Sequence, residues 1–199
     1  MKPLKFIFII FFANIFCDNS IEREMRESSI CENNDPVRDV AFVRIGRYNG
    51  YTDKGSEYQK TYLVSRYAKT TWMNAKTYCK SFDLDLVSFE TLTEVYNFID
   101  MAKENSFVKS LGGVHMLVDG MTPTPNTTTE WYWTNTGTKV SFTLPWQEGE
   151  PNFLNNGEYC LALSAHEVST LGFNDFPCDV GLSPFVCQRA DFYVPLRAN

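Results

Sequence analysis

Five side chains with oxygen donors lie between positions 150 and 175 of this 199-residue chain. Three carry carboxylates and two carry carboxamides, in the order Glu150, Asn152, Glu158, Asn174 and Asp175. Hard oxygen donors of this kind suit Ca²⁺, which takes about 6–8 oxygen ligands in flexible geometry. The chain has only 2 histidines, far apart in sequence, so no Cys/His spacing indicates a softer metal. The residue types therefore predict a calcium site.

The segments around this set follow the order of a known domain. Residues 71–79 (TWMNAKTYC) end in a cysteine, and residues 131–133 (WYW) precede residues 145–146 (PW) and 149–152 (GEPN). Together with the acids and amides, they resemble a C-type lectin domain over about residues 57–189. The resemblance implies an α+β, disulfide-bridged fold with two helices, small antiparallel sheets and a long loop region that binds calcium and sugar.

The resemblance also assigns a role to the five oxygen-bearing residues, because calcium and sugar share one ligand set in such domains. An ion with open positions takes two vicinal sugar hydroxyls, while carboxylates accept hydrogen bonds and asparagine amides donate them. The motif Glu150-Pro151-Asn152 resembles the members that bind mannose, fucose or N-acetylglucosamine. Galactose is disfavoured, although Phe153 could offer an aromatic face to it. The resemblance further implies a cis peptide before Pro151.

A second calcium site, present in many relatives, is expected to be lost here. Asp119 occupies one of its positions, but the others hold Pro123, Phe153 and Tyr159. These three side chains cannot replace carboxylates as calcium ligands. We therefore expect one ion.

The first seventeen residues are predicted to be a signal peptide. Lys2 and Lys5 precede an apolar run, residues 6–16, that is too short to span a bilayer, which needs about 20 residues. A membrane anchor or a buried strand is the less favoured alternative. We expect secretion and no membrane insertion. The formal net charge of −6 becomes more negative without this segment, which argues against binding to nucleic acid.

The cysteine pattern fits an oxidising compartment. Beyond the predicted signal peptide lie Cys31, Cys79, Cys160, Cys178 and Cys187. Four cysteines allow three pairings, and the residues alone leave these open. The resemblance implies Cys79–Cys187 and Cys160–Cys178. Cys31 is then left over, and a disulfide-linked homodimer, a bridge to Cys17 or a free thiol are the alternatives.

The elements that must position the site are predicted from periodicity and turn residues. Residues 18–56 are expected to form an extension with little structure of its own, and residues 190–199 a short tail. Residues 60–67 alternate as a strand does. Apolar residues at helical spacing predict a first helix with one buried stripe, formed by Trp72, Ala75, Cys79 and Phe82.

A second helix is predicted to begin after residue 91. Thr91 and Glu94 read as a capping box, in which the side chain of each residue accepts a hydrogen bond from the backbone amide of the other. The expected apolar face consists of Leu92, Val95, Tyr96 and Ile99.

Three further expectations concern function. Asn126-Thr127-Thr128 is the only sequon and is predicted to be a glycosylation site. His166 is expected to be solvated rather than to contact sugar. We hypothesise a secreted lectin of microbial recognition or extracellular matrix, with a protein-binding domain of the same fold as the alternative. An enzyme is disfavoured because neither histidine sits in a motif that would activate a nucleophile.

Overall fold

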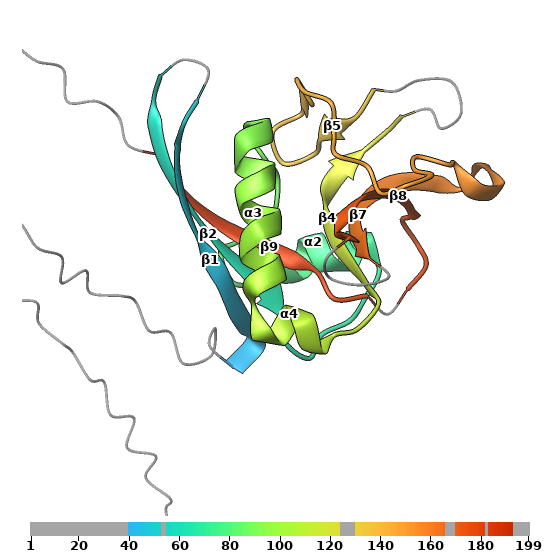
Figure 1. Ribbon diagram of the computed structural model, residues 1–199, viewed down its shortest axis with the longest axis horizontal. Coiled ribbons are helices and arrows are strands. Elements are labelled where there is room, and N and C mark those ends of the chain that lie inside the picture. The colour runs from blue at the N-terminus through green and yellow to red at the C-terminus, as the bar shows by residue number, and fades with distance from the viewer. Residues whose placement is uncertain (1–39, 53–54, 124–129, 166–169, 182, 193–199) are drawn as a thin grey trace, which may run out of the picture. The chain divides into compact units, whose positions relative to one another are not determined.

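The computed structural model describes residues 40–192, apart from 53–54, 124–129, 166–169 and 182 (Figure 1). Along the chain the elements are β1 (Phe42–Tyr51), β2 (Glu57–Ser65), α2 (Trp72–Lys80), β3 (Asp85–Leu86), α3 (Leu92–Glu104), α4 (Ser106–Ser110), β4 (Val114–Met121), β5 (Tyr132–Trp133), β6 (Thr138–Lys139), the 3-10 helix η1 (Leu154–Asn156), β7 (Glu158–Ala165), β8 (Gly172–Pro177) and β9 (Val186–Phe192). Within this part of the chain, none of the helices is both long and apolar enough to span a bilayer.

Two antiparallel sheets confirm the predicted α+β class. One has the strand order β1-β2-β9-β3 and the other the order β6-β5-β4-β7-β8. In Figure 1 the green helix α3 runs between the β1–β2 hairpin and the strands β4, β7 and β8. Its buried residues join one apolar core with residues from both sheets, so α3 is the element against which the two sheets pack.

Residues 42–51 correct one expectation. They fall in the segment for which we expected little structure, yet they form the edge strand β1, paired antiparallel with β2 over its whole length. The alternating pattern was hidden by Gly46 and Gly50, which pack closely against Met101 and Tyr58 and have no side chain to mark a face. Residues 18–39 of the predicted extension and most of the predicted tail lie outside the described residues.

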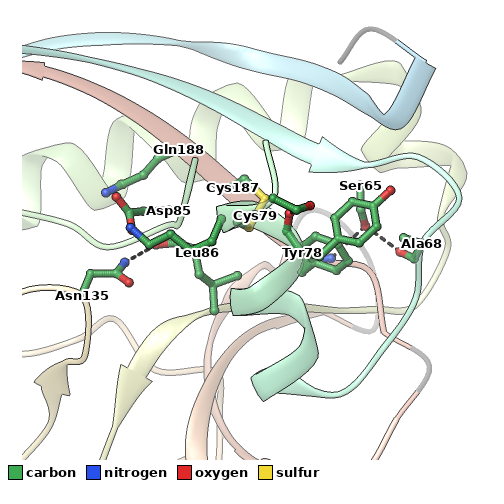
Figure 2. Close-up of a disulfide and its surroundings, with 12 residues drawn as sticks. Ser65, Ala68, Tyr78, Cys79, Asp85, Leu86, Asn135, Cys187 and Gln188 are labelled. Atoms are coloured by element: carbon green, nitrogen blue, oxygen red, sulfur yellow. Dashed lines mark hydrogen bonds and ion pairs between the residues drawn. A yellow bond between two sulfur atoms is a disulfide. The ribbon is translucent and has the colours of Figure 1, made fainter. Parts of the chain in front are cut away.

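The two disulfides have the pairing that the resemblance implies. Cys79–Cys187 joins α2 to β9, and Figure 2 shows it beside Leu86, whose carbonyl oxygen accepts a hydrogen bond of 2.6 Å from the Asn135 side chain. Cys160–Cys178 joins β7 to the residues that follow β8. The second bridge therefore ties together the two strands that carry Glu158, Asn174 and Asp175.

The first helix follows its predicted stripe. Trp72, Ala75 and Cys79 are buried on α2, and Phe82 packs partly buried against the same cluster. The helix ends at Lys80, so Phe82 lies in the turn beyond it. The predicted strand 60–67 is present as β2, displaced towards the N-terminus to Glu57–Ser65.

The second helix, α3, differs from its prediction on one face. Val95 and Ile99 are buried as expected, together with Phe98, which the apolar pattern had left out. Tyr96 was expected inside but is 50% exposed. Both residues are aromatic and lie two positions apart, on different faces of the helix, and the prediction assigned the wrong one to the core.

The capping box at residue 91 is half confirmed. The Thr91 hydroxyl accepts a hydrogen bond of 3.1 Å from the Glu94 backbone amide, as a cap does. The Glu94 side chain is fully buried and does not return to Thr91. It accepts from the backbone amide of Glu90 at 2.7 Å and from the hydroxyls of Tyr58 at 2.8 Å and Tyr62 at 2.6 Å.

A buried lysine completes this network. The ammonium group of Lys60, a fully buried side chain, lies 2.9 Å from a Glu94 carboxylate oxygen and donates to the Ser88 carbonyl at 2.8 Å. Burial, and then the Glu94 charge, raise the pKa of Tyr58 and of Tyr62 well above the usual range, so both stay protonated donors. The network fastens β2 to the start of α3.

Candidate metal centre

The five predicted oxygen ligands come from three neighbouring segments. Glu150 and Asn152 lie in the loop before η1, joined through a cis peptide bond between Glu150 and Pro151. Glu158 is the first residue of β7, and Asn174 and Asp175 lie on β8. Since β7 and β8 pair antiparallel, with Asp175 opposite Leu161, the strand ends and the loop meet at one edge of the second sheet.

Backbone amides of the loop hold two of the carboxylates in place. The Asp175 side chain is fully buried, and its two oxygens accept hydrogen bonds from the amides of Asn152 at 3.0 Å and Phe153 at 2.7 Å. A Glu158 oxygen accepts from the amide of Leu154 at 2.7 Å. These amides were not part of the prediction, because a sequence pattern identifies side-chain donors and not the path of the main chain.

The third carboxylate is packed against the other two. Glu150 accepts a hydrogen bond of 3.1 Å from the Asn152 amide and shares a hydrogen bond with Asp175. Burial, this hydrogen bond and the charges of Asp175 and Glu158 raise the pKa of Glu150 to about 7. Burial also raises the pKa of Glu158. Mutual repulsion and desolvation therefore act against the ionised forms.

In the described part of the chain, this charge has no basic partner. Among the described residues, no lysine or arginine forms an ion pair with the three carboxylates. The site is consequently a concentration of negative charge that a cation would stabilise.

Asn174 provides an independent sign of an absent partner. Its side-chain oxygen is buried and accepts no hydrogen bond from any group in the described part of the chain. Such an acceptor costs about 1–3 kcal/mol when it is left unsatisfied. A carboxamide oxygen beside carboxylates is also an ordinary ligand of Ca²⁺. The donor chemistry of the set therefore fits this ion.

The geometry is less complete than the chemistry. Within residues 40–192, as far as they are described, no three acidic, His or Cys side chains are arranged as a ready metal cage. The Asn152 side chain is exposed. The structure thus brings the carboxylates together and leaves their oxygens engaged with loop amides.

Asp119, the one acid expected at the second calcium site, is satisfied by contacts within the chain itself. Asp119 is fully buried and accepts hydrogen bonds from the Thr134 hydroxyl and from the Asn135 amide at 3.0 Å. The Lys76 ammonium lies 3.9 Å from the same carboxylate. Burial raises the pKa of Asp119, and the contacts with Thr134, Asn135 and Lys76 reduce this rise. Its function is to hold the 134–135 turn against β4.

A cluster of aromatic side chains packs against the loop that carries Glu150 and Asn152. Phe153 stacks on Trp131 with ring centres 6.4 Å apart and planes at 7°, and Trp146 packs against Trp131 at 5.5 Å. Phe173 is fully buried and contacts Trp146 edge to face. One face of the Phe153 ring is therefore covered by protein. The predictions at Cys31, Asn126 and His166 lie outside the described residues.

Comparisons with known proteins point in one direction. Residues 68–189, more than half of the chain, match the family model described as "Lectin C-type domain". The snake protein "C-type lectin BML-2" of Bungarus multicinctus is 30% identical over 122 residues, which are 59% of this chain and 70% of that protein. A galactose-binding isoform of Pseudechis australis and a mannose-binding isoform of Oxyuranus scutellatus are each 28% identical over 59% of this chain, and the matches cover 70% and 69% of those proteins.

A solved structure supports the same architecture. The C-type lectin domain of murine dendritic cell inhibitory receptor 2, solved in complex with an N-glycan, aligns with a TM-score of 0.51 at 23% identity. The alignment covers 66% of this chain and 91% of that one. At this level of identity the likeness establishes the fold.

Proposed function

Since the chain belongs to the C-type lectin domain family, we propose that it is a secreted lectin that binds glycans through one Ca²⁺ ion. Members of the family are binding proteins rather than enzymes. The observation that carries the proposal is the meeting of three carboxylates without a basic partner among the described residues, together with the unsatisfied oxygen of Asn174, which precedes Asp175 on β8.

The proposed ligands are of two kinds, carboxylates and carboxamides, with different roles towards the sugar. We expect the ion to be held by Glu150, Asn152, Glu158, Asn174 and Asp175. Once bound, it would supply open positions for two vicinal hydroxyls of a sugar. The carboxylates accept hydrogen bonds from these hydroxyls, and the asparagine amides donate hydrogen bonds to them. Glu150 before Pro151 and Asn152 after it resemble mannose-type binders, so we propose mannose, fucose or N-acetylglucosamine as the terminal sugar.

A single ion is supported by the state of the second site. The Asp119 oxygens already accept hydrogen bonds from Thr134 and Asn135, and Lys76 supplies a positive charge beside them. This carboxylate therefore has little capacity left for a cation.

The proposal is tested by affinity chromatography. The purified protein should be retained on immobilised mannose in calcium and released by EDTA, with weaker retention on immobilised galactose. Retention that survives EDTA, or none on any sugar, would contradict the proposal. In that case the alternative is a protein-binding domain of the same fold, favoured by the amide hydrogen bonds that Asp175 and Glu158 already accept.

The raised pKa of Glu150 predicts a pH dependence with a defined sign. The pKa is about 7 in this structure against an ordinary 4.5, so the folded protein holds this proton more tightly than the unfolded chain does. The contribution to stability is complete below about pH 4.5 and is lost as the pH rises through about 7. In EDTA the melting temperature should therefore fall across this window, while calcium, which favours the ionised form, should oppose the fall.

The measurement is the melting temperature in calcium minus that in EDTA, followed from pH 5 to pH 7.5. We expect the difference to grow with pH, because the free energy that calcium adds to stability should rise towards the ~2.7 kcal/mol expected at a hundredfold excess over the dissociation constant. In the variant Glu150→Gln, whose side chain has no proton to lose, this difference should grow less with pH. An equal difference at both ends of the range would refute the assignment of Glu150.

The remaining proposals concern processing. We propose that residues 1–17 direct secretion, that Asn126 carries a glycan and that Cys31 bridges two copies of the chain. Intact mass spectrometry of the secreted protein, with and without reduction and with and without glycosidase treatment, distinguishes each of these from the unmodified chain.

A further inference from the structure

A cavity of about 620 Å³ lies next to the candidate metal centre, outside the five predicted ligands. Three segments line it: α3, the loop 145–148 and the residues 170–172 that lead into β8. Its volume falls within the range of roughly 300–1,000 Å³ that is usual for small-ligand sites. Nothing in the proposed calcium chemistry uses this space.

The α3 wall presents polar and aromatic groups together. Tyr96, Asp100 and Lys103 line the cavity, and their spacing places them on one face of the helix. Tyr96 lines the cavity and is 50% exposed, so its ring is accessible to a ligand. The helix therefore contributes an aromatic face, a carboxylate and an ammonium group.

The loop wall has the same mixed character. Trp146 contributes an indole, Gln147 a carboxamide and Glu148 a second carboxylate. A pyranose has an apolar ring face that packs on aromatic rings and hydroxyls that both donate and accept hydrogen bonds. The lining offers acceptors in its carboxylates, a donor in Lys103 and both in Gln147. This combination fits a sugar better than a purely apolar or a singly charged ligand.

The backbone places the cavity directly beside the metal centre. Trp146 forms a parallel bridge with Phe173, since the Phe173 amide donates to the Pro145 carbonyl at 2.9 Å and the Gln147 amide donates to the Phe173 carbonyl at 2.8 Å. Just beyond this bridge, the loop reaches Glu150, whose amide donates to the Gln147 carbonyl at 3.0 Å.

Strand β8 also connects the cavity to the candidate metal centre. The cavity is lined by its first residue, Gly172, and the predicted ligands Asn174 and Asp175 follow two and three positions later. At about 3.3 Å per residue of extended chain, these two ligands lie roughly 7–10 Å along the strand from Gly172. Adjoining sugars of one glycan can therefore occupy both sites.

We propose that this cavity is a second saccharide subsite, which takes an inner sugar of a glycan whose terminal sugar is held at the calcium site. The inference rests on the proposed function, because it needs a sugar at that site. It goes further in naming the ligand as an oligosaccharide and in assigning Tyr96, Asp100 and Gln147 to its recognition.

The test compares one sugar with several by titration calorimetry in calcium. Methyl α-mannoside probes the calcium site alone, and a mannose trisaccharide probes both sites. The trisaccharide should bind more tightly, and Tyr96→Ala should remove about three- to tenfold of its affinity, the range expected for loss of one aromatic contact. The monosaccharide affinity should stay unchanged in this variant. Asp100→Ala, at an exposed position, should act in the same direction.

Tyr51→Ala is the matched control. Tyr51 is 66% exposed at the end of β1 and does not line the cavity, so its replacement should change neither affinity. Equal loss of trisaccharide binding in Tyr96→Ala and Tyr51→Ala, or equal affinity of both saccharides for the unmodified protein, would overturn the subsite while leaving the lectin proposal intact. Failure to bind either saccharide in calcium would overturn both.

Discussion

Replacing Asn174 by alanine is expected to abolish calcium-dependent retention on mannose without destabilising the calcium-free protein. The side-chain oxygen of Asn174 is buried and accepts no hydrogen bond from the described residues. Its removal therefore breaks no acceptor contact in the calcium-free state and relieves an unsatisfied polar group. In calcium the same change would remove one proposed ligand of the ion. Function and stability should consequently separate in this variant.

We expect Asn174→Ala to cause a large loss of calcium affinity and only a small change in stability. Even second-layer partners of a metal site change metal affinity by about 10–100-fold, so loss of a ligand should weaken calcium binding by at least about tenfold. Calcium affinity is measured by titration calorimetry, and stability by thermal unfolding in EDTA. Asn74→Ala, at an exposed asparagine of α2, is the control and should change neither quantity.

A second variant separates the metal from the sugar. Asn174→Asp keeps an oxygen that can bind Ca²⁺ but loses the amide that donates a hydrogen bond to a hydroxyl. We expect calcium binding to persist and mannose binding to fall. Full mannose retention in Asn174→Ala would remove Asn174 from the site, whatever the behaviour of the aspartate variant.

The sequence predicted the candidate site as a set of residue types and not as a geometry. The order of Glu150, Asn152, Glu158, Asn174 and Asp175 carried the resemblance to the family, and the family is shown by the match over residues 68–189. The amide donors of residues 152–154 could not be predicted, because they depend on how the loop folds over Asp175 and Glu158.

In the fold, too, features set by nearby residues were predicted, and features set by distant residues were missed. The α2 stripe was predicted because its period is local. Strand β1 was missed because its pairing with β2 depends on residues up to 23 positions away, and its glycines weaken the alternation. Phe98 and Tyr96 exchanged roles for a related reason: the core that Phe98 enters, against Tyr62 and Phe89, is assembled from separate segments.

Glu94 is the clearest case of a long-range contact hidden behind a local motif. The pattern around Thr91 predicted a helix cap, and the Thr91 half of it is present. The carboxylate, however, meets two tyrosine hydroxyls and the Lys60 ammonium, all from β2 and separated from it in sequence by more than thirty residues. A propensity rule cannot include partners so distant, yet these partners decide how much the residue contributes to stability.

Glu94→Ala is therefore expected to be the most destabilising single change among those considered. Removing one partner of a buried ion pair costs about 3–5 kcal/mol. Lys60 would remain buried and charged without its nearer carboxylate, with only the partly exposed Glu90 left at 3.6 Å. Denaturant unfolding at neutral pH measures the loss. Glu104→Ala is the matched control, since its pair with Lys109 is 3.3 Å long but exposed, and its loss should cost less than about 1 kcal/mol.

Two further variants identify the origin of the effect. Glu94→Gln keeps the size and an acceptor for Tyr58 and Tyr62 but removes the charge, so it should be less destabilising than alanine and remain folded for measurement. Combining it with Lys60→Met removes both buried charges, and the double variant should be more stable than the sum of the single losses predicts. If Glu94→Ala costs no more than Glu104→Ala, or if the losses simply add, the ion pair is not what fastens β2 to α3, and packing of the two tyrosines must do so.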